Sequence, residues 1–366
     1  MTTRAKPAKS GNPAVRNAAR SSKRSAALGP RTPPLAATAP KVAKAPSKAT
    51  KAATPKAATP KATTPKAMTP KAMNGPASNT VVSSQRGVAT TDFAVRFWGV
   101  RGSIPVPGPD TAGIGGNTSC VEIRCGEHII IFDAGTGLRL LGNSLMRQMP
   151  VDVHLFFSHV HWDHIQGFPF FAPAFIPGNR IFMYGGKNVS GTVETALAGQ
   201  MEMPNFPVHL SMLPAKLAFN DLHEGEVVDI GSGCTVTNAA GNHPGGVYAY
   251  RVDYRGKSVI YATDTEHYSI PDPKLVALAK NADVLIFDTM YTPEEYAGVG
   301  GMPKTGWGHS HFEAGVALCK AANIKHYVLF HHDPAQTDAM VREKERRTQA
   351  IFPSAEAAYE GLTLSL

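Results

Sequence analysis

The first 91 residues of this 366-residue chain contain no acidic residue and no aromatic side chain; the first of each are Asp92 and Phe93. The same segment holds 17 of the 37 Lys and Arg residues, so residues 92–366 carry 20 basic and all 28 acidic residues, a net charge of −8. The formal charge of +9 for the whole chain therefore describes neither part. A segment with no aromatic and few other large apolar side chains cannot bury a core. We expect a disordered basic tail over residues 1–91 and one folded domain over residues 92–366.

Long apolar runs and paired cysteines are also absent. No stretch of apolar residues reaches the length of a membrane-spanning helix, and the N-terminus lacks the apolar core of a secretory signal. The four cysteines form no C-x-x-C pair and are interpreted as reduced thiols. These absences favour a cytoplasmic protein that does not act on membranes.

The tail contains a five-residue repeat, KAATP KAATP KATTP KAMTP KAMNG, over residues 51–75. A proline in every repeat prevents helix formation, so we expect an extended chain with lysines roughly 15 Å apart. Two interpretations stay open. The tail is a solvated linker, or it contacts the phosphates of nucleic acid without sequence preference and associates the protein with the nucleoid. No aromatic residue is available to stack on bases.

In the body many apolar strands come first, some of them as hairpins, and helices are interspersed later. This pattern predicts sheets covered by helices, an α/β fold without regular βαβ alternation. Strands are expected at residues 93–100, 121–124, 128–132, 151–157, 181–184, 226–230, 235–239, 247–254, 258–262, 284–287 and 326–330, and helices at 138–149, 190–199, 273–281, 312–322 and 338–351.

The strongest signal is an H-x-H-x-D-H motif directly after the strand 151–157. It places His159, His161, Asp163 and His164 within six residues. His159 and His161 point the same way if the chain stays extended, whereas Asp163 and His164 follow in a turn and approach from another side. Imidazoles combined with a carboxylate suit Zn, Fe or Mn, and two unlike sets of ligands suit two metals. The competing interpretation is a polar loop with solvated histidines.

Further candidate ligands follow later strands. His243 comes after strand 235–239, Asp264 after strand 258–262, and the pair His331 and His332 after strand 326–330. Each alone is typical of a capping or turn residue, but the ordered set strengthens the prediction of a metal site.

In this order of ligands the chain resembles the metallo-β-lactamase superfamily. Four flanking segments resemble the branch that holds ribonuclease Z and the cyclic-phosphate phosphodiesterases of phosphonate breakdown. They are Phe97-Trp-Gly-Val-Arg-Gly-Ser-Ile-Pro105, Gly115-Gly-Asn-Thr-Ser-Cys120, Ile131-Phe-Asp-Ala-Gly-Thr-Gly137 and Gly308-His-Ser-His311. The resemblance implies an αββα sandwich with metals at the sheet edges.

The resemblance also implies residue roles. His159, His161 and His243 would hold one divalent ion, and Asp163, His164 and His331 a second, with Asp264 bridging and His332 as the alternative to His331. Zn is the default metal, with Mn and Fe compatible. No other cofactor is expected.

Asp163 and His309 are the expected catalytic residues, with His309 protonating the leaving oxygen or binding the phosphate. Asp133 would orient a ligand histidine or cap a turn. His311 stands where related enzymes often carry Thr.

These features predict a binuclear phosphodiesterase that acts on a cyclic phosphate, a nucleotide or RNA by attack of a metal-bridging hydroxide. The partners expected are such a substrate and a second copy of the chain in a homodimer. Residues 165–242 lack the basic arm that ribonuclease Z enzymes use as a tRNA clamp, so the basic tail would have to replace it. The alternatives are a thioester or lactone hydrolase of the same fold, and an inactive metal-stabilised scaffold tethered to nucleic acid.

Overall fold

A computed structural model of the chain describes residues 92–186 and 191–366. The tail predicted for residues 1–91 and its lysine repeat lie outside the described residues, so the tail, its role and the domain boundary stay predictions. Among the described residues, no helix has the length and apolarity needed to cross a bilayer.

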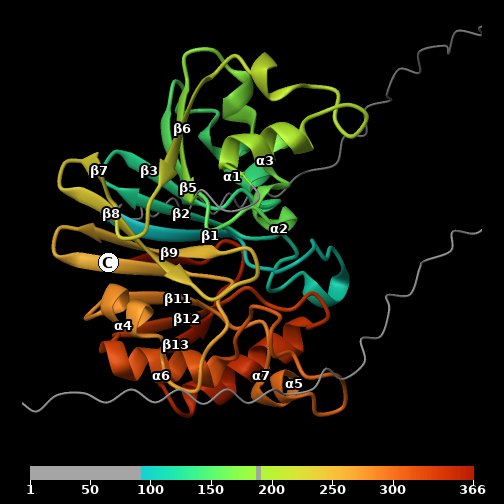
Figure 1. Ribbon diagram of the computed structural model, residues 1–366, viewed down its shortest axis with the longest axis vertical. Helices are drawn as coiled ribbons and strands as arrows, with labels where there is room; N and C mark the ends of the chain where they lie inside the picture. Colours follow the sequence, from blue (N-terminus) through green and yellow to red (C-terminus); the bar gives the residue numbers. More distant parts are fainter. Residues whose placement is uncertain (1–91, 187–190) are drawn as a thin grey trace, which may run out of the picture. The chain divides into compact units, whose positions relative to one another are not determined.

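Two seven-stranded sheets form the centre of the described body (Figure 1). The first has the order β14-β1-β2-β3-β4-β5-β6 and the second the order β13-β12-β11-β10-β9-β8-β7. The first sheet contains β1 (Phe93–Gly99), β2 (Cys120–Cys125), β3 (His128–Phe132), β4 (Asp152–Phe156), β5 (Arg180–Gly186), β6 (Lys216–Leu222) and β14 (Thr363–Ser365). The second contains β7 (Val227–Gly231), β8 (Cys234–Gly241), β9 (Val247–Tyr254), β10 (Lys257–Ala262), β11 (Val284–Asp288), β12 (His326–Phe330) and β13 (Ala355–Ala357).

Each sheet is antiparallel on one side and parallel on the other. In the first sheet β14, β1, β2 and β3 pair antiparallel, and β3 to β6 pair parallel. In the second, β7 to β10 pair antiparallel and β10 to β13 pair parallel. Because parallel strands end at the same edge of a sheet, side chains that follow β3, β4, β10, β11 and β12 are brought together there.

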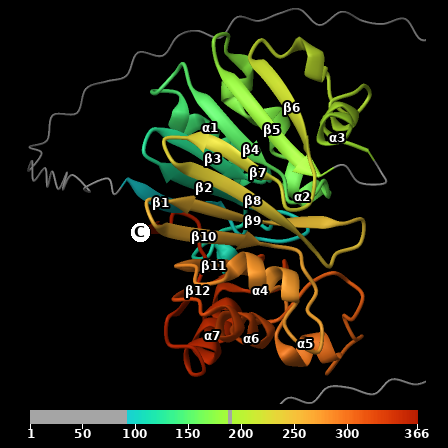
Figure 2. The same ribbon diagram turned by 60° about the vertical axis from the view of Figure 1, so that its left-hand side comes forward.

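Helices cover the outer faces of the two sheets (Figures 1 and 2). The helices α1 and α3 lie against the first sheet, and α4, α6 and α7 against the second. The α-helices are α1 (Gly137–Leu145), α2 (Trp162–Ile165), α3 (Val193–Gln200), α4 (Pro273–Ala279), α5 (Pro293–Ala297), α6 (Phe312–Ala322) and α7 (Asp338–Gln349). The short 3-10 helices are Pro109–Thr111, Phe168–Phe170, Ala172–Phe175 and Leu210–Met212. This layering confirms the predicted αββα sandwich.

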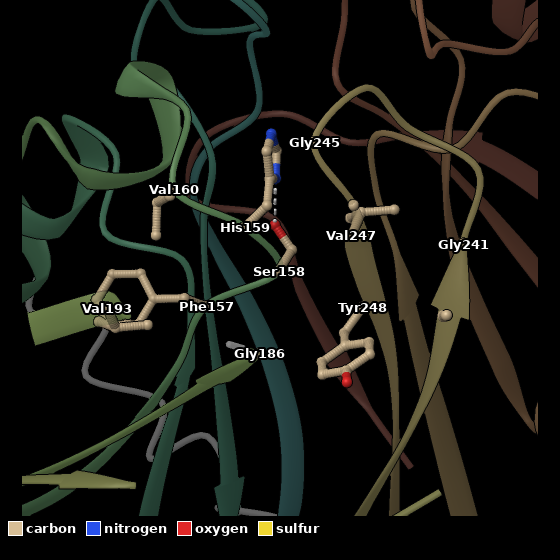
Figure 3. Close-up of a pocket in the computed structure, with 12 residues that line it drawn as sticks. Phe157, Ser158, His159, Val160, Gly186, Val193, Gly241, Gly245, Val247 and Tyr248 are labelled. Atoms are coloured by element: carbon tan, nitrogen blue, oxygen red, sulfur yellow. Dashed lines mark hydrogen bonds between the residues drawn. The ribbon is translucent and has the colours of Figure 1, made fainter. Parts of the chain in front are cut away.

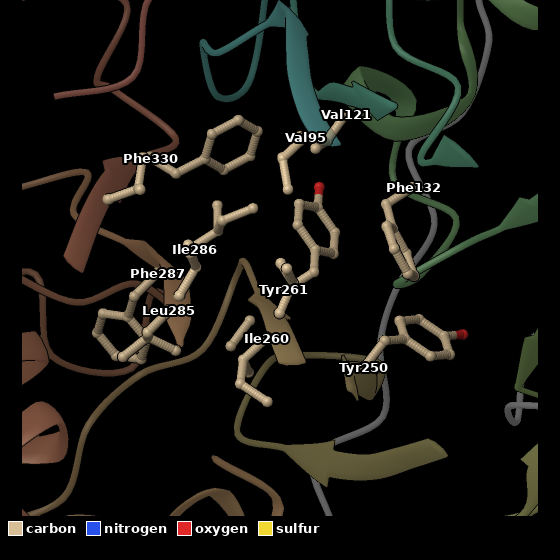
Figure 4. Packing of buried hydrophobic residues seen from close by; sticks show 14 of the residues in the cluster. Val95, Val121, Phe132, Tyr250, Ile260, Tyr261, Leu285, Ile286, Phe287 and Phe330 are labelled. Atoms are coloured by element: carbon tan, nitrogen blue, oxygen red, sulfur yellow. The ribbon is translucent and has the colours of Figure 1, made fainter. Parts of the chain in front are cut away.

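The main core lies between the sheets and is rich in aromatic rings (Figure 4). The ring of Phe132 from the first sheet stacks on that of Tyr261 from the second, with centroids 5.1 Å apart. Tyr250 and Phe330 are fully buried beside them. Aromatic pairs of this kind stabilise more than their buried area alone and fix how the sheets face each other. The core thereby sets the relative position of the strand ends that carry the site.

Most predicted elements are confirmed, and the errors lie at helix ends and edge strands. Strands 247–254 and 326–330 and helix 312–322 have the predicted bounds. The helix predicted at 138–149 ends at Leu145, and the one predicted from Ser190 begins at Val193, where Thr192 forms a capping box. The strands β6, β13 and β14 were not predicted. β6 has a single buried residue and the other two strands are three residues long, so none carries a clear alternating pattern.

Candidate metal centre

The predicted histidines and aspartates meet at the edge where the parallel strands of both sheets end. β4 leads through Ser158 into the segment that supplies His159 and His161, and α2 directly after it supplies Asp163 and His164. The second sheet contributes side chains one at a time, namely His243 after β8, Asp264 after β10, Asp288 at the end of β11 and His331 after β12.

Three imidazoles form the first cluster. His159 Nε2 lies 2.8 Å from His161 Nδ1, and His243 Nε2 lies 3.0 Å from the same atom. His243 Nδ1 donates a hydrogen bond to the carbonyl of Gly308 at 2.8 Å, which leaves its Nε2 unprotonated in the neutral ring. Three ring nitrogens that converge in this way suit a metal ion such as Zn²⁺.

Two carboxylates and two imidazoles form the second cluster. His164 Nε2 lies 3.2 Å from Asp163 Oδ2 and 3.2 Å from Asp264 Oδ1. His331 Nε2 lies 3.2 Å and 3.1 Å from the same two oxygens. Ligand atoms about 2.0 Å from a tetrahedral ion are about 3.3 Å apart, so these spacings fit a small divalent cation. The buried His164 Nε2 has no hydrogen-bond partner among the described residues, which also fits a ligand atom.

Asp264 faces both clusters. Its Oδ1 belongs to the second cluster, whereas its Oδ2 lies 3.8 Å from His159 Nε2 and 4.0 Å from His243 Nε2 in the first. The backbone of Asp264 has a positive φ of 50°, and Asp133 and His331 each have a φ of 60°. Residues other than glycine rarely adopt this left-handed conformation, and strained residues of this kind are enriched at functional sites.

Asp133 holds the segment that carries the H-x-H-x-D-H motif. Its Oδ2 lies 2.7 Å from His164 Nδ1, and its Oδ1 accepts a hydrogen bond from Ser158 N at 2.7 Å. Tyr261 donates its hydroxyl to the same carboxylate at 2.7 Å. Because the carboxylate accepts the Nδ1 proton of His164, the Nε2 of that ring is presented to the second cluster.

Burial and charge favour the protonation states that metal binding needs in His159, His243 and Asp264. Burial lowers the pKa of His159 and of His243, so both rings are neutral at pH 7. Burial alone would raise the pKa of Asp264, but the imidazoles of His331 and His164 outweigh it and lower that pKa well below its usual range. Neutral imidazoles and an ionised carboxylate are the ligand forms of these groups.

His309 lies beside both clusters. Its Nδ1 is 2.8 Å from Asp288 Oδ2, and its ring stacks on that of His331 with centroids 5.1 Å apart. Burial lowers the pKa of His309, but Asp288 raises it more, to about 9. A carboxylate can only accept, so His309 Nδ1 carries a proton and Nε2 is the atom free to face a substrate.

Comparison with known proteins identifies the family. Residues 128–332 match the family model described as the beta-lactamase superfamily domain. The chain belongs to the beta-lactamase superfamily. This membership, with the histidine and aspartate clusters, makes the chain a metal-dependent hydrolase.

Named relatives in this superfamily are distant in sequence. Ribonuclease BN of Cronobacter sakazakii is 22% identical over 261 residues, which cover 58% of this chain and 81% of the relative. Ribonuclease Z of Staphylococcus carnosus is 27% identical over 213 residues, with 56% and 64% covered, so the chain spans under two thirds of that relative. Ribonuclease Z of Pyrococcus furiosus is 24% identical, with 71% and 93% covered.

Solved structures share the superfamily fold. A diphosphatase from the PhnP family is 19% identical with a TM-score of 0.56, and 75% of this chain and 98% of that one are covered. The short form of human tRNase Z is 18% identical with a TM-score of 0.53, with 74% and 98% covered. At this identity the likeness supports the fold alone.

The structure separates His331 from His332. His331 lies in the second cluster, whereas His332 is buried away from it with Nε2 3.0 Å from the carbonyl of Ala358. His311 does not reach the clusters; it accepts a hydrogen bond from Ala314 N at the start of α6, and burial lowers its pKa to about 4. The open choice between the two neighbouring histidines thus falls on His331.

Three phenylalanines that follow the motif, together with Trp307 and Asn117, lie outside the two clusters. Phe168 and Phe171 are buried in the core beneath α1, whereas Phe170 is 58% exposed. Trp307 is half exposed, and the ammonium of Lys304 lies 4.1 Å from its ring centroid. Asn117 donates its side-chain amide to Glu360 and does not join the clusters.

Sequence reasoning missed two residues that support the site. Asp288 pairs with His309; its position at the end of a strand next to other ligand-bearing strands was the signal that could have found it. Glu266 accepts hydrogen bonds from Gly306 N at 2.7 Å and Gly308 N at 2.8 Å, which fixes the loop before His309. No motif marks Glu266, because its partners are backbone groups far along the chain.

Proposed function

We propose that this chain hydrolyses phosphodiesters with two divalent metal ions. The first ion would bind to His159, His161 and His243, and the second to Asp163, His164 and His331, with Asp264 shared. The observation that carries this proposal is the position of Asp264, which turns one carboxylate oxygen toward each cluster. A site for one structural ion would need neither a second cluster nor a shared ligand.

The bound ions would supply a hydroxide nucleophile near pH 7 and stabilise charge on the phosphate oxygens. The residues of the chain have separate tasks. Asp163 and Asp264 stay ionised and keep the site anionic, and Asp133 orients His164 through its Nδ1. Asp288 holds His309 so that Nε2 can deliver a proton to the leaving oxygen, which general acid catalysis of ester cleavage requires.

The named relatives support a phosphodiester substrate. They are called ribonuclease Z and ribonuclease BN. For this chain we propose a small phosphodiester, a nucleotide or an RNA, with Zn as the first metal to test and Mn or Fe as alternatives. The only basic residues in the sequence from 165 to 242 are Arg180, Lys187 and Lys216. This makes a tRNA clamp within the body less favoured than a small substrate.

Metal analysis combined with a substrate panel tests the proposal. The panel is bis(p-nitrophenyl) phosphate, a cyclic nucleotide, a precursor tRNA and a thioester, each assayed before and after removal of metal with a chelator. We expect two metal ions per chain and hydrolysis of at least one phosphodiester that is lost with the metal and restored by Zn²⁺ or Mn²⁺. Activity on the thioester alone would show that the fold serves a different ester chemistry here.

A further inference from the structure

A cavity of about 310 Å³ opens next to the first cluster (Figure 3). His159 belongs to the cluster and also lines the cavity. The walls come from both sheets and from α3: Phe157 and Val193 lie on one side, and Val247 and Tyr248 on the other. A group attached to a phosphate at the clusters can therefore enter this cavity, and its volume suits one ring system rather than a polymer.

The described part of the cavity wall is mainly apolar. Among the described residues that line it, none is Lys, Arg, Asp or Glu, and Ser158 and His159 are its polar side chains other than the phenol of Tyr248. Phe157, Val160, Val193 and Val247 provide hydrocarbon surface, and the phenol of Tyr248 provides a flat face. An apolar ring would bury its area favourably against these residues.

Small residues keep the cavity open. A Cβ atom on Gly186 would lie 2.7 Å from the Tyr248 ring, so glycine here lets that ring lie across the end of β5. Cβ atoms on Gly245 and Gly246 would meet no other atom within 4 Å, so this side of the cavity borders open space. The space is thus limited by the rings and branched side chains opposite.

We infer that this cavity binds one uncharged, apolar ester group of the substrate, of the size of a single ring system. The inference rests on the proposed phosphodiesterase function and narrows its substrate class. The protein would prefer a small diester with an aromatic or similarly apolar alcohol component over a diester whose components are all charged.

Binding of three phosphonates to the metal-loaded protein tests this inference separately from turnover. Calorimetry gives the Kd of methylphosphonate, phenylphosphonate and 4-carboxyphenylphosphonate. We expect phenylphosphonate to bind at least about tenfold more tightly than methylphosphonate, and the added carboxylate to remove most of that gain. Equal Kd values for the phenyl and methyl compounds, or tightest binding of the carboxylate, would overturn the inference.

Two variants locate the binding. Val193→Phe fills the cavity and should abolish the preference for phenyl over methyl, and Tyr248→Leu, which removes the flat face, should reduce it at least threefold. Val227→Phe is the matched control, because Val227 is 58% exposed on β7 outside the cavity, and it should keep the full preference.

The inference would also be overturned if Val193→Phe and Tyr248→Leu both kept the full preference for phenylphosphonate over methylphosphonate. The three Kd values could follow the expected order while no phosphodiester is hydrolysed. In that case the proposed function is wrong, but the inference that the cavity binds an uncharged ring is supported.

Discussion

The two sheets contribute to the metal centre in different ways. The first sheet supplies four candidate ligands from a single stretch after β4, held in place by Asp133. The second supplies His243, Asp264 and His331 from three separate strand ends, so their positions depend on the register of the whole sheet. The difference shows that one half of the site is a local motif and the other half is a product of the fold.

One candidate ligand from each half also differs in how much of it is exposed to solvent. His161, from the motif, is exposed, whereas His331, from the second sheet, is completely buried. Loss of either ligand should therefore affect metal binding, but loss of His331 should reduce the stability of the fold more than loss of His161.

The largest effect is expected for Asp264→Asn, because this carboxylate faces both clusters. The value of kcat/KM on bis(p-nitrophenyl) phosphate should fall by about 10³-fold or more, and the metal content should fall below two ions per chain. Asp221→Asn on β6 is the control, since Asp221 is exposed and outside the site. An active Asp264→Asn variant with full metal content would remove the shared ligand from the account.

A comparison of His331→Ala with His161→Ala tests the difference in exposure. In the metal-free protein, His331→Ala should lower the free energy of unfolding by roughly 2–4 kcal/mol, because Asp163 and Asp264 lose a buried partner. His161→Ala should lower it by less than about 1 kcal/mol. Urea denaturation of both variants measures the two free energies of unfolding. Equal decreases in the two variants would contradict the expected dependence on burial.

Asp133→Asn tests how the motif is held. The amide cannot replace the carboxylate toward His164, Ser158 and Tyr261 together, so Zn²⁺ affinity should fall by about 10- to 100-fold. Competition with a chromophoric chelator measures the affinity. Asp253→Asn is the control for removing a carboxylate, since Asp253 is a half-buried residue of β9 outside the site. Unchanged affinity would mean that the backbone after β4 alone orients the ligands.

The smallest effect concerns Lys344, a buried residue of α7, which covers the second sheet. Its ammonium donates to Gln336 Oε1 at 2.8 Å, and burial lowers its pKa to about 7 despite the opposing charges of Glu295 and Asp288. The unfolded chain has a lysine pKa near about 10.4, so between these values it binds more protons than the folded chain. Stability should therefore rise with pH across this window.

The variant Lys344→Met has no titrating group at this position and is therefore the reference for the pH dependence of the free energy of unfolding. The free energy of unfolding of the unaltered protein, minus that of Lys344→Met, should increase by roughly 1–2 kcal/mol from pH 7 to pH 9. A difference that does not change with pH would show that the lysine keeps its ordinary pKa in the folded state.

The parts that sequence reasoning predicted are those with local signals. The motif from His159 to His164, the buried strands and helix Phe312–Ala322 follow from residue order and periodicity alone. Asp264 and His331 became candidates because strand ends and a family resemblance marked them. Asp288 and Glu266 were missed because their roles depend on which strands and loops become neighbours, and short edge strands such as β14 carry no pattern of their own.

The two-metal centre can be observed in a crystal of the Zn²⁺-loaded protein, with anomalous scattering measured at the zinc edge. We expect two anomalous peaks, one bound by His159, His161 and His243 and the other by Asp163, His164 and His331, with Asp264 between them. A single peak, or peaks bound by other residues, would contradict this expectation.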